Sequence, residues 1–224
     1  MISRVPSDAT RSEAQTPAAL RPRRAICVYC GSASGTGPAY VAAAQTLGRD
    51  MAAAGYGLVY GGGGIGLMGE VARAVRGAGG HVLGIIPGFL REREVHFKDT
   101  SELIVTKDMH ERKMLMFERA DAFVALPGGI GTLEELIEQM TWAQLGRHFK
   151  PIVIADIAGF WRPLLTLLDH MEAEAFLRKP FMGGGGGRAL YDIVTDPSQI
   201  VPVVTEQLRV LPPCIGSQDI KDRF

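Results

Sequence analysis

Short apolar segments alternate with helix-like segments along most of this chain, and this alternation constrains the fold more than any other feature. The apolar runs are near-continuous, as in Val82–Ile86 and Ala122–Leu126. Strands of this kind belong to parallel sheets that are covered on both faces. The sequence therefore predicts an α/β fold: a Rossmann-like open parallel sheet with helices on both faces, in a single domain.

The expected strands and helices follow one another in a regular order from residue 25 onward. Strands are predicted at Ala25–Cys30, Gly57–Tyr60, His81–Ile86, Leu103–Val105, Ala122–Leu126 and Pro151–Ala155. Helices are predicted at Tyr40–Ala54, Leu67–Arg76, Met109–Arg119, Thr132–Leu145 and Trp161–Ala175. The 224 residues then divide into a disordered N-terminal extension over 1–24, the domain over 25–204 and a C-terminal tail over 205–224. Five consecutive glycines, Gly183–Gly187, predict a mobile loop.

Charge and composition exclude several classes of protein. Lys and Arg balance Asp and Glu at 24 each, so the basic excess of a general nucleic-acid binder is missing. No apolar run approaches the roughly 18 residues that span a membrane, and the leader lacks the apolar core of a secretory signal. The leader contains five Arg, so an organelle transit peptide is the alternative to a bacterial extension. With three cysteines, we expect a cytoplasmic protein that binds neither nucleic acid nor membrane.

Two of the cysteines, Cys27 and Cys30, have the spacing of a redox or zinc motif. Both lie in a predicted strand, where steps of about 3.3 Å place their Cα atoms roughly 10 Å apart and on opposite faces. A disulfide requires a separation below about 7 Å. We therefore expect two separate structural cysteines and no metal site.

Three glycine-bearing turns follow predicted strands, at the positions where open parallel sheets bind ligands. They are Gly31–Gly35, Gly61–Gly69 and Pro127–Gly131. The second contains Gly64-Ile-Gly-Leu-Met-Gly69, the spacing of a dinucleotide fingerprint. That fingerprint requires an acidic residue after the next strand, where this chain has Pro87 and Gly88. No nicotinamide or flavin cofactor is therefore expected, and the second turn serves either close packing or the approach of backbone amides to a ligand.

The third turn is the best candidate for an anion site. Its glycines leave backbone N–H groups uncovered at the start of a helix, and a helix N-terminus attracts phosphate. Thr132 adds a hydroxyl donor. Spacing alone also fits a capping box, in which Thr132 caps the helix and Glu135 reaches back to it.

A charged segment, Asp108–Lys113, is predicted at the start of another helix. It is either a solvated face in which Asp108 pairs with Arg112 one turn later, or a cluster that faces an anion and a sugar. Trp142 and the apolar positions of the helix over 132–145 are expected to pack in the core or a dimer contact rather than to form a base pocket.

Six blocks of this sequence resemble, in order, the motifs of the Lonely Guy (LOG) family, the cytokinin-activating phosphoribohydrolases formerly described as possible lysine decarboxylases. They are Cys30–Ser32, Tyr60–Gly63 with Gly66–Gly69, Ile86–Pro87, Met109–Lys113, Pro127–Glu135 and Thr141–Gly146. The resemblance covers residues 25–204 and implies a Rossmann-like homodimer with active sites near the interface. It implies hydrolysis of N6-modified adenosine 5′-monophosphate, or of AMP, to free base and ribose 5-phosphate, without a cofactor.

By motif, the resemblance assigns catalysis to Arg112 and Glu135. It assigns substrate binding to a larger set: Glu94, Lys113, Gly128, Gly129, Ile130, Gly131, Thr132, Leu133, Glu134 and Thr141. Three features depart from the family pattern, namely Ile130 in place of the Tyr usual in plant members, the long leader, and Gly183–Gly187.

The chemistry of the bond suggests a role for each candidate. Cleavage of an N-glycosidic bond builds positive charge on the ribose, which carboxylates stabilise. We expect Glu135 to hold the ribose hydroxyls or the attacking water, and Gly129–Thr132 to anchor the 5′-phosphate. Arg112 keeps its proton, because the pKa of a guanidinium exceeds about 12, so it stabilises charge or polarises the leaving base.

Two alternatives belong to other classes of protein. The first is a Rossmann-like carrier of a nucleotide or of molybdenum cofactor that performs no catalysis. The second is a pyridoxal decarboxylase, which needs a Schiff-base lysine and a phosphate cup on a larger scaffold; none of the lysines lies in such a setting.

Overall fold

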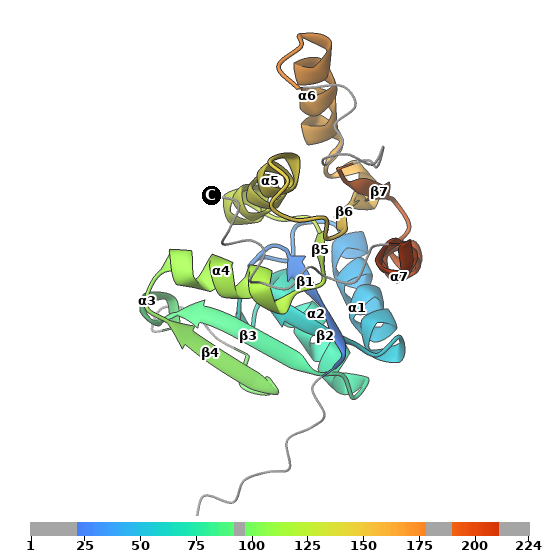
Figure 1. Cartoon of the computed structure of the whole chain (residues 1–224). Coiled ribbons are helices and arrows are strands. Elements are labelled where there is room, and N and C mark those ends of the chain that lie inside the picture. Colours follow the sequence, from blue (N-terminus) through green and yellow to red (C-terminus); the bar gives the residue numbers. More distant parts are fainter. Residues whose placement is uncertain (1–21, 92–96, 178–189, 211–224) are drawn as a thin grey trace, which may run out of the picture.

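The computed structural model describes residues 22–91, 97–177 and 190–210, which form one α/β unit (Figure 1). Its strands are β1 (Arg24–Tyr29), β2 (Tyr56–Tyr60), β3 (Val82–Pro87), β4 (Glu102–Thr106), β5 (Ala122–Ala125), β6 (Ile152–Ala155) and β7 (Asp192–Val194). Its α-helices are α1 (Pro38–Ala53), α2 (Gly66–Gly77), α3 (Gly88–Arg91), α4 (Met109–Arg119), α5 (Ile130–Gln144), α6 (Arg162–Ala173) and α7 (Ile200–Val210). None of the described helices is long and apolar enough to cross a membrane.

The seven strands form one parallel sheet in the order β4-β3-β2-β1-β5-β6-β7. β1 is central, and its Cys27 pairs with Val59 of β2 on one side and with Phe123 of β5 on the other. The chain therefore extends the sheet from β1 in one direction and later returns to extend it in the other. Such a reversal opens a crevice at the carboxyl ends of the two strands that flank it, here β1 and β5.

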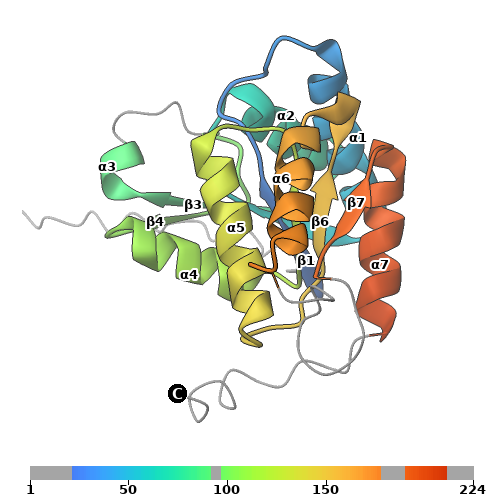
Figure 2. The same ribbon diagram turned by 90° about the horizontal axis from the view of Figure 1, so that it is seen from above.

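The helices divide between the two faces of the sheet, as the sequence predicts (Figures 1 and 2). α1, α2 and α7 bury their apolar residues against one face, and α4, α5 and α6 bury theirs against the other. Cys30 belongs to the first core and Cys27 to the second, and both are free thiols. This confirms that the Cys-x-x-Cys spacing is structural, because side chains alternate across a strand.

The six predicted strands and five predicted helices are present, with ends displaced by at most two residues and with both ends of Met109–Arg119 as predicted. The structure adds α3, β7 and α7, of which α3 and β7 are too short for a clear sequence pattern. α7 continues past the boundary predicted at residue 204, and its Val201, Val204 and Leu208 are buried at helical spacing. Residues 1–21, Glu94 and Gly183–Gly187 lie outside the described residues.

Candidate active site

A cavity of about 260 Å³ lies at the carboxyl ends of β1, β2 and β5, at the predicted crevice. The β1 strand and turn form one wall, and the start of α5 forms another. Residues of β2, α2 and α4 complete it. Its main lining residues are Tyr29, Cys30, Gly31, Ser32, Gly61, Met68, Met109, Arg112, Met116, Gly129, Ile130, Gly131, Thr132, Glu134 and Glu135.

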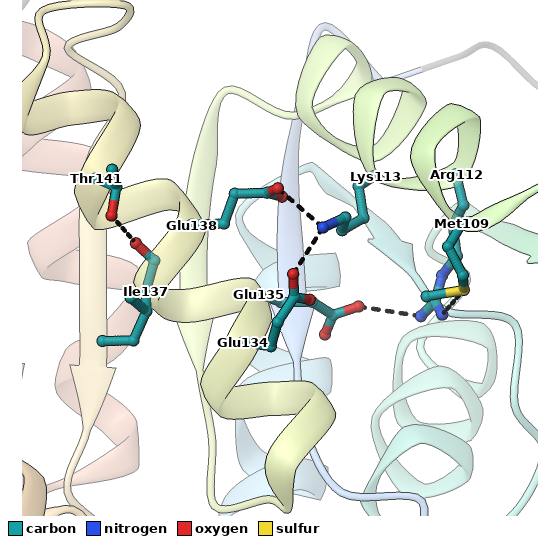
Figure 3. Close-up of polar contacts among 8 residues, drawn as sticks. All are labelled: Met109, Arg112, Lys113, Glu134, Glu135, Ile137, Glu138 and Thr141. Atoms are coloured by element: carbon teal, nitrogen blue, oxygen red, sulfur yellow. Dashed lines mark hydrogen bonds and ion pairs between the residues drawn. The ribbon is translucent and has the colours of Figure 1, made fainter.

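Inside this cavity α4 and α5 are joined by an ion pair between Arg112 and Glu135. Arg112 Nη2 lies 3.1 Å from Glu135 Oε1, and both side chains are largely buried (Figure 3). Arg112 Nη1 also points to the thioether of Met109, 3.7 Å away. The two side chains that the family resemblance marks as catalytic are therefore in contact, although they are 23 residues apart in the chain.

Asp108 has a different partner from the one that spacing allows. Its carboxylate accepts a hydrogen bond from the Glu111 N–H at 2.9 Å and so caps α4, while Glu111 accepts from the Lys107 N–H at 2.8 Å. The interpretation of this segment as a solvated face with an Asp108–Arg112 pair is therefore wrong. The cap starts α4 at Met109 and leaves Arg112 free to point toward α5.

Gly61, directly after β2, provides room for the guanidinium of Arg112. A Cβ atom at this position would lie 2.5 Å from Arg112 Nη2, closer than real contacts allow. A side chain here would therefore force the guanidinium to move from its observed position beside Glu135. The signal for this space in the sequence is the run of glycines after β2, but the sequence does not indicate which side chain needs the space.

Burial dominates the electrostatics of Glu135. Desolvation raises the pKa of its carboxyl to about 7, with a smaller contribution from the negative charge of Glu134, while Arg112 opposes the rise. Near neutral pH this carboxyl therefore exchanges a proton readily. Perturbed carboxyls of this kind gather at functional sites.

The start of α5 presents unpaired backbone donors to the cavity. The first N–H groups of any α-helix have no intrahelical partner, and the N-cap of α5, Gly129, has no side chain to bind them. A Cβ atom at Gly129 or Gly131 would meet nothing within 4 Å, so the space above this turn is open. These are the features of an anion site at a helix N-terminus.

The capping-box interpretation of Thr132 and Glu135 is wrong. The helix begins at Ile130, so Thr132 already lies within the first turn, where it is buried. Glu135 contacts Arg112 rather than the backbone.

The second glycine turn packs against the first through the start of α2, although Gly61 and Met68 of this turn also line the cavity. The N–H groups of Leu67 and Met68, in the first turn of α2, donate to the carbonyls of Ala33 and Gly31 at 3.4 and 3.2 Å. Gly66 has a φ of 60°, and a Cβ atom there would collide with the backbone of Ser32. Of the two interpretations of this turn, the structure supports close packing for the start of α2.

The remaining predicted site residues lie in different places. Lys113 contacts Glu134 and Glu138 beside the cavity. Thr141 is exposed outside the cavity, where its hydroxyl donates to the Ile137 carbonyl at 2.7 Å. Leu133 is partly buried against the apolar core.

Trp142 packs edge-to-face on Phe117, with ring centroids 5.1 Å apart, as expected for a packing residue. Sequence reasoning did not single out Tyr29, Gly61, Met68, Met109 or Met116 as cavity residues. Most of them lie in the motif blocks, which were their only signal.

Comparison with known proteins supports one family. The model of a family described as possible lysine decarboxylase matches residues 68–197. The chain is 51% identical over 154 residues to the cytokinin riboside 5′-monophosphate phosphoribohydrolase LOG of Oryza sativa subsp. japonica. The aligned region covers 69% of this chain and 64% of that protein. The chain is also 50% identical over 152 residues to the cytokinin riboside 5′-monophosphate phosphoribohydrolase LOG7 of Arabidopsis thaliana. This alignment covers 68% of the present chain and 70% of the Arabidopsis protein. The match thus spans slightly less than two thirds of the rice protein.

Solved structures with the same fold include molybdenum cofactor proteins. The Moco carrier protein of Chlamydomonas reinhardtii superimposes with a TM-score of 0.63 at 22% identity, over 84% of this chain and 100% of that one. The molybdenum cofactor binding protein of Rippkaea orientalis superimposes with a TM-score of 0.60 at 20% identity, over 82% of this chain and 97% of that one. At this identity the likeness establishes the Rossmann-like fold alone.

Proposed function

Because this chain belongs to the LOG family of cytokinin riboside 5′-monophosphate phosphoribohydrolases, we propose that it hydrolyses the N-glycosidic bond of N6-modified adenosine 5′-monophosphate, or of AMP, to free base and ribose 5-phosphate. The observation that carries this proposal is the buried Arg112–Glu135 pair in the same cavity as the uncapped start of α5. One cavity thus offers an anion site and a carboxylate that can face a sugar.

The substrate is held by its phosphate. The 5′-phosphate lies in the open space over Gly129 and Gly131 and accepts hydrogen bonds from the N–H groups at the start of α5. This contact fixes the ribose in the cavity. Glu135 follows on the same helix, one turn further on, so a ribose anchored there has its reacting face near this carboxylate.

Glu135 and Arg112 then divide the chemistry. The bond between ribose C1′ and the base breaks, its electron pair leaves with the base, and the carboxylate of Glu135 stabilises the cationic ribose. Water adds to C1′ and gives up a proton to Glu135, which later releases it to solvent, while the leaving base takes up a proton from solvent. Arg112 keeps its own proton and stabilises developing negative charge on the leaving base.

This role requires the ionised form of Glu135. Because burial raises the pKa of this carboxyl to about 7, we expect kcat/KM of the wild-type protein to fall as the pH drops through about 7. An ordinary glutamate would place the fall between about pH 4 and 5. A pH–rate profile of kcat/KM distinguishes a Glu135 with a raised pKa from an ordinary glutamate.

The direct test is release of free base, followed by chromatography, from AMP and from isopentenyladenosine 5′-monophosphate. We expect Glu135→Gln to fold normally and to lose at least about 100-fold in kcat. Glu118→Gln, on the exposed side of α4, is the control and should behave as wild type. Nucleotide binding without base release by the wild-type protein would overturn the proposal and favour a non-catalytic nucleotide carrier.

We also propose that the protein is a cytoplasmic homodimer. Thr141 matches a substrate-binding position of the family, yet it lies on the exposed side of α5, away from the Arg112–Glu135 pair (Figure 3). Leu145, one turn later, is an exposed apolar side chain. A second copy against this side would cover Leu145 and bring Thr141 close to the partner's substrate. Light scattering should show a dimer for the wild-type protein and a monomer for Leu145→Asp.

A further inference from the structure

A second ionic link joins α4 to α5 beside the Arg112–Glu135 pair. Lys113 Nζ lies 2.6 Å from Glu134 Oε1 and 2.8 Å from Glu138 Oε1 (Figure 3). One ammonium therefore holds two carboxylates that are one helical turn apart on α5. Lys113 follows Arg112 directly on α4, and Glu134 precedes Glu135 directly on α5, so the two links occupy consecutive positions on both helices.

The two carboxylates on Lys113 have different surroundings. The side chain of Glu134 is 50% exposed and lines the cavity, so it can change partner when a substrate enters. The side chain of Glu138 is 20% exposed and is not part of the cavity lining. Its second oxygen, Oε2, is buried without a hydrogen-bond partner among the described residues. Glu138 thus has Lys113 as its counter-ion and has no path to a substrate in this cavity.

Burying a carboxylate in this way is costly unless it is paired. The pair also constrains geometry, because Lys113 and Arg112 belong to the same turn of α4. Fixing the ammonium against α5 fixes how α4 lies along α5, and so fixes the position from which the Arg112 guanidinium reaches Glu135. A displacement of about 1 Å at such a site can cost up to about 100-fold in rate.

We propose that Glu138 is a positioning residue for the glycosidic cleavage: it holds Lys113 on α5 and thereby keeps Arg112 opposite Glu135, whereas Glu134 contacts the substrate. The inference rests on the proposed function. It assigns different roles to two glutamates that share one lysine, and it accounts for a buried carboxylate that does not reach the cavity.

Glu138 also acts on Glu135 through its charge. Its negative charge raises the pKa of Glu135, as the charge of Glu134 does. Burial remains the main cause of the raised pKa. Removing the charge of Glu138 by itself should lower the pKa of Glu135. Displacement of Arg112 from Glu135 should raise it, and Arg112 has the larger effect of the two. The two effects have opposite signs, so a shift of this titration to higher pH indicates lost positioning, and a shift to lower pH indicates the loss of charge alone.

The test compares Glu138→Gln with Glu134→Gln, two isosteric changes that each remove one carboxylate from Lys113. For Glu138→Gln we expect kcat to fall about tenfold with KM changed less than about threefold. We also expect the acid limb of the pH–rate profile to move to higher pH, because Arg112 is displaced from Glu135. For Glu134→Gln we expect the larger change in KM. Wild-type kcat and an unmoved acid limb in Glu138→Gln, or a change in KM alone, would overturn the proposal.

A measurement without turnover separates this proposal from the proposed function. The titration of the Glu135 carboxyl, followed by ¹³C NMR, should move to higher pH in Glu138→Gln and remain in place in Glu118→Gln. If the wild-type protein releases no base, the proposed function fails, and an unmoved Glu135 titration would still refute the coupling to Glu138. Should Glu138→Gln fail to fold, Glu138→Asp keeps the charge but shortens its reach, and should lower kcat with a smaller shift of the acid limb.

Discussion

At the residue scale, the glycines of the turn before α5 have two different functions. A Cβ atom at Gly128 would collide with the side chain of Thr132 and would lie 2.9 Å from the Gly31 nitrogen. At Gly129 and Gly131 the same atom would meet nothing within 4 Å. Gly128 is therefore required for packing between the β1 turn and α5, while the space beside Gly129 and Gly131 is open, as the proposed phosphate site requires.

This difference predicts opposite outcomes for two otherwise similar changes. Gly131→Ala should leave the melting temperature unchanged or slightly raised, since Ala favours a helix, but it should raise KM for AMP because the methyl group occupies the phosphate space. Gly128→Ala should destabilise the protein by about 1–3 kcal/mol through overpacking. Thermal unfolding and steady-state kinetics check both, and equal losses of stability in the two variants would contradict the assignment.

At the element scale, α1 and α2 are packed so closely that one position of α1 has no room for a side chain. A Cβ atom at Gly48 would lie 2.6 Å from the Ala74 Cβ and 2.8 Å from the Val71 carbonyl oxygen. This contact sets the position of α2, whose first turn in turn supports the β1 turn through the Leu67 and Met68 N–H groups. The packing of two helices thus helps to shape one wall of the cavity.

Gly48→Ala should therefore lower the free energy of unfolding by about 1–3 kcal/mol, because the helices must separate to admit the methyl group. The matched control is Gly77→Ala near the end of α2, where a Cβ atom meets nothing within 4 Å. That change should be neutral or should stabilise by up to about 1 kcal/mol, since Ala has the higher helix propensity. Urea unfolding measures both, and wild-type stability of Gly48→Ala would show that the helix pair adapts.

At the scale of the whole molecule, two buried groups couple stability to pH with opposite signs. His148 Nδ1 accepts from the Lys150 N–H at 3.1 Å, so its Nε2 carries the proton toward the Gln139 carbonyl, 3.2 Å away. Burial lowers the pKa of this neutral imidazole to about 4. Its contribution to stability is complete above its unfolded pKa and is lost as the pH falls toward about 4. Glu135, with its pKa raised to about 7, contributes below its unfolded pKa and loses that contribution as the pH rises through about 7.

Between about pH 4.5 and 6.5, His148 and Glu135 change the free energy of unfolding with pH in opposite directions. Removing one of them by substitution should therefore reveal the pH dependence that the other causes. Relative to wild type, Glu135→Gln should lose stability more steeply on acidification through this window. His148→Gln should instead lose stability more steeply as the pH rises. Urea unfolding at half-unit pH steps measures both slopes, and parallel pH curves for wild type and both variants would refute the assignment.

The sequence by itself determined the local elements. Apolar runs of strand length, helical spacing and glycines at strand ends are short-range signals, and they located β1 to β6, the main helices and the edge of the sheet at which the cavity lies. The short β7 and α3 lack such signals.

Only the tertiary structure decided which side chains meet. Local spacing allowed Asp108 to pair with Arg112 and Thr132 to cap with Glu135, and neither contact forms, because the fold brings Arg112 to Glu135 from another helix. The glycine turns are a second example. Carbonyls of the distant β1 turn accept hydrogen bonds from N–H groups in the first turn of α2, whereas the first N–H groups of α5 remain open. Burial and long-range hydrogen bonds depend on how the chain returns to itself, and a pattern of neighbouring residues does not contain that information.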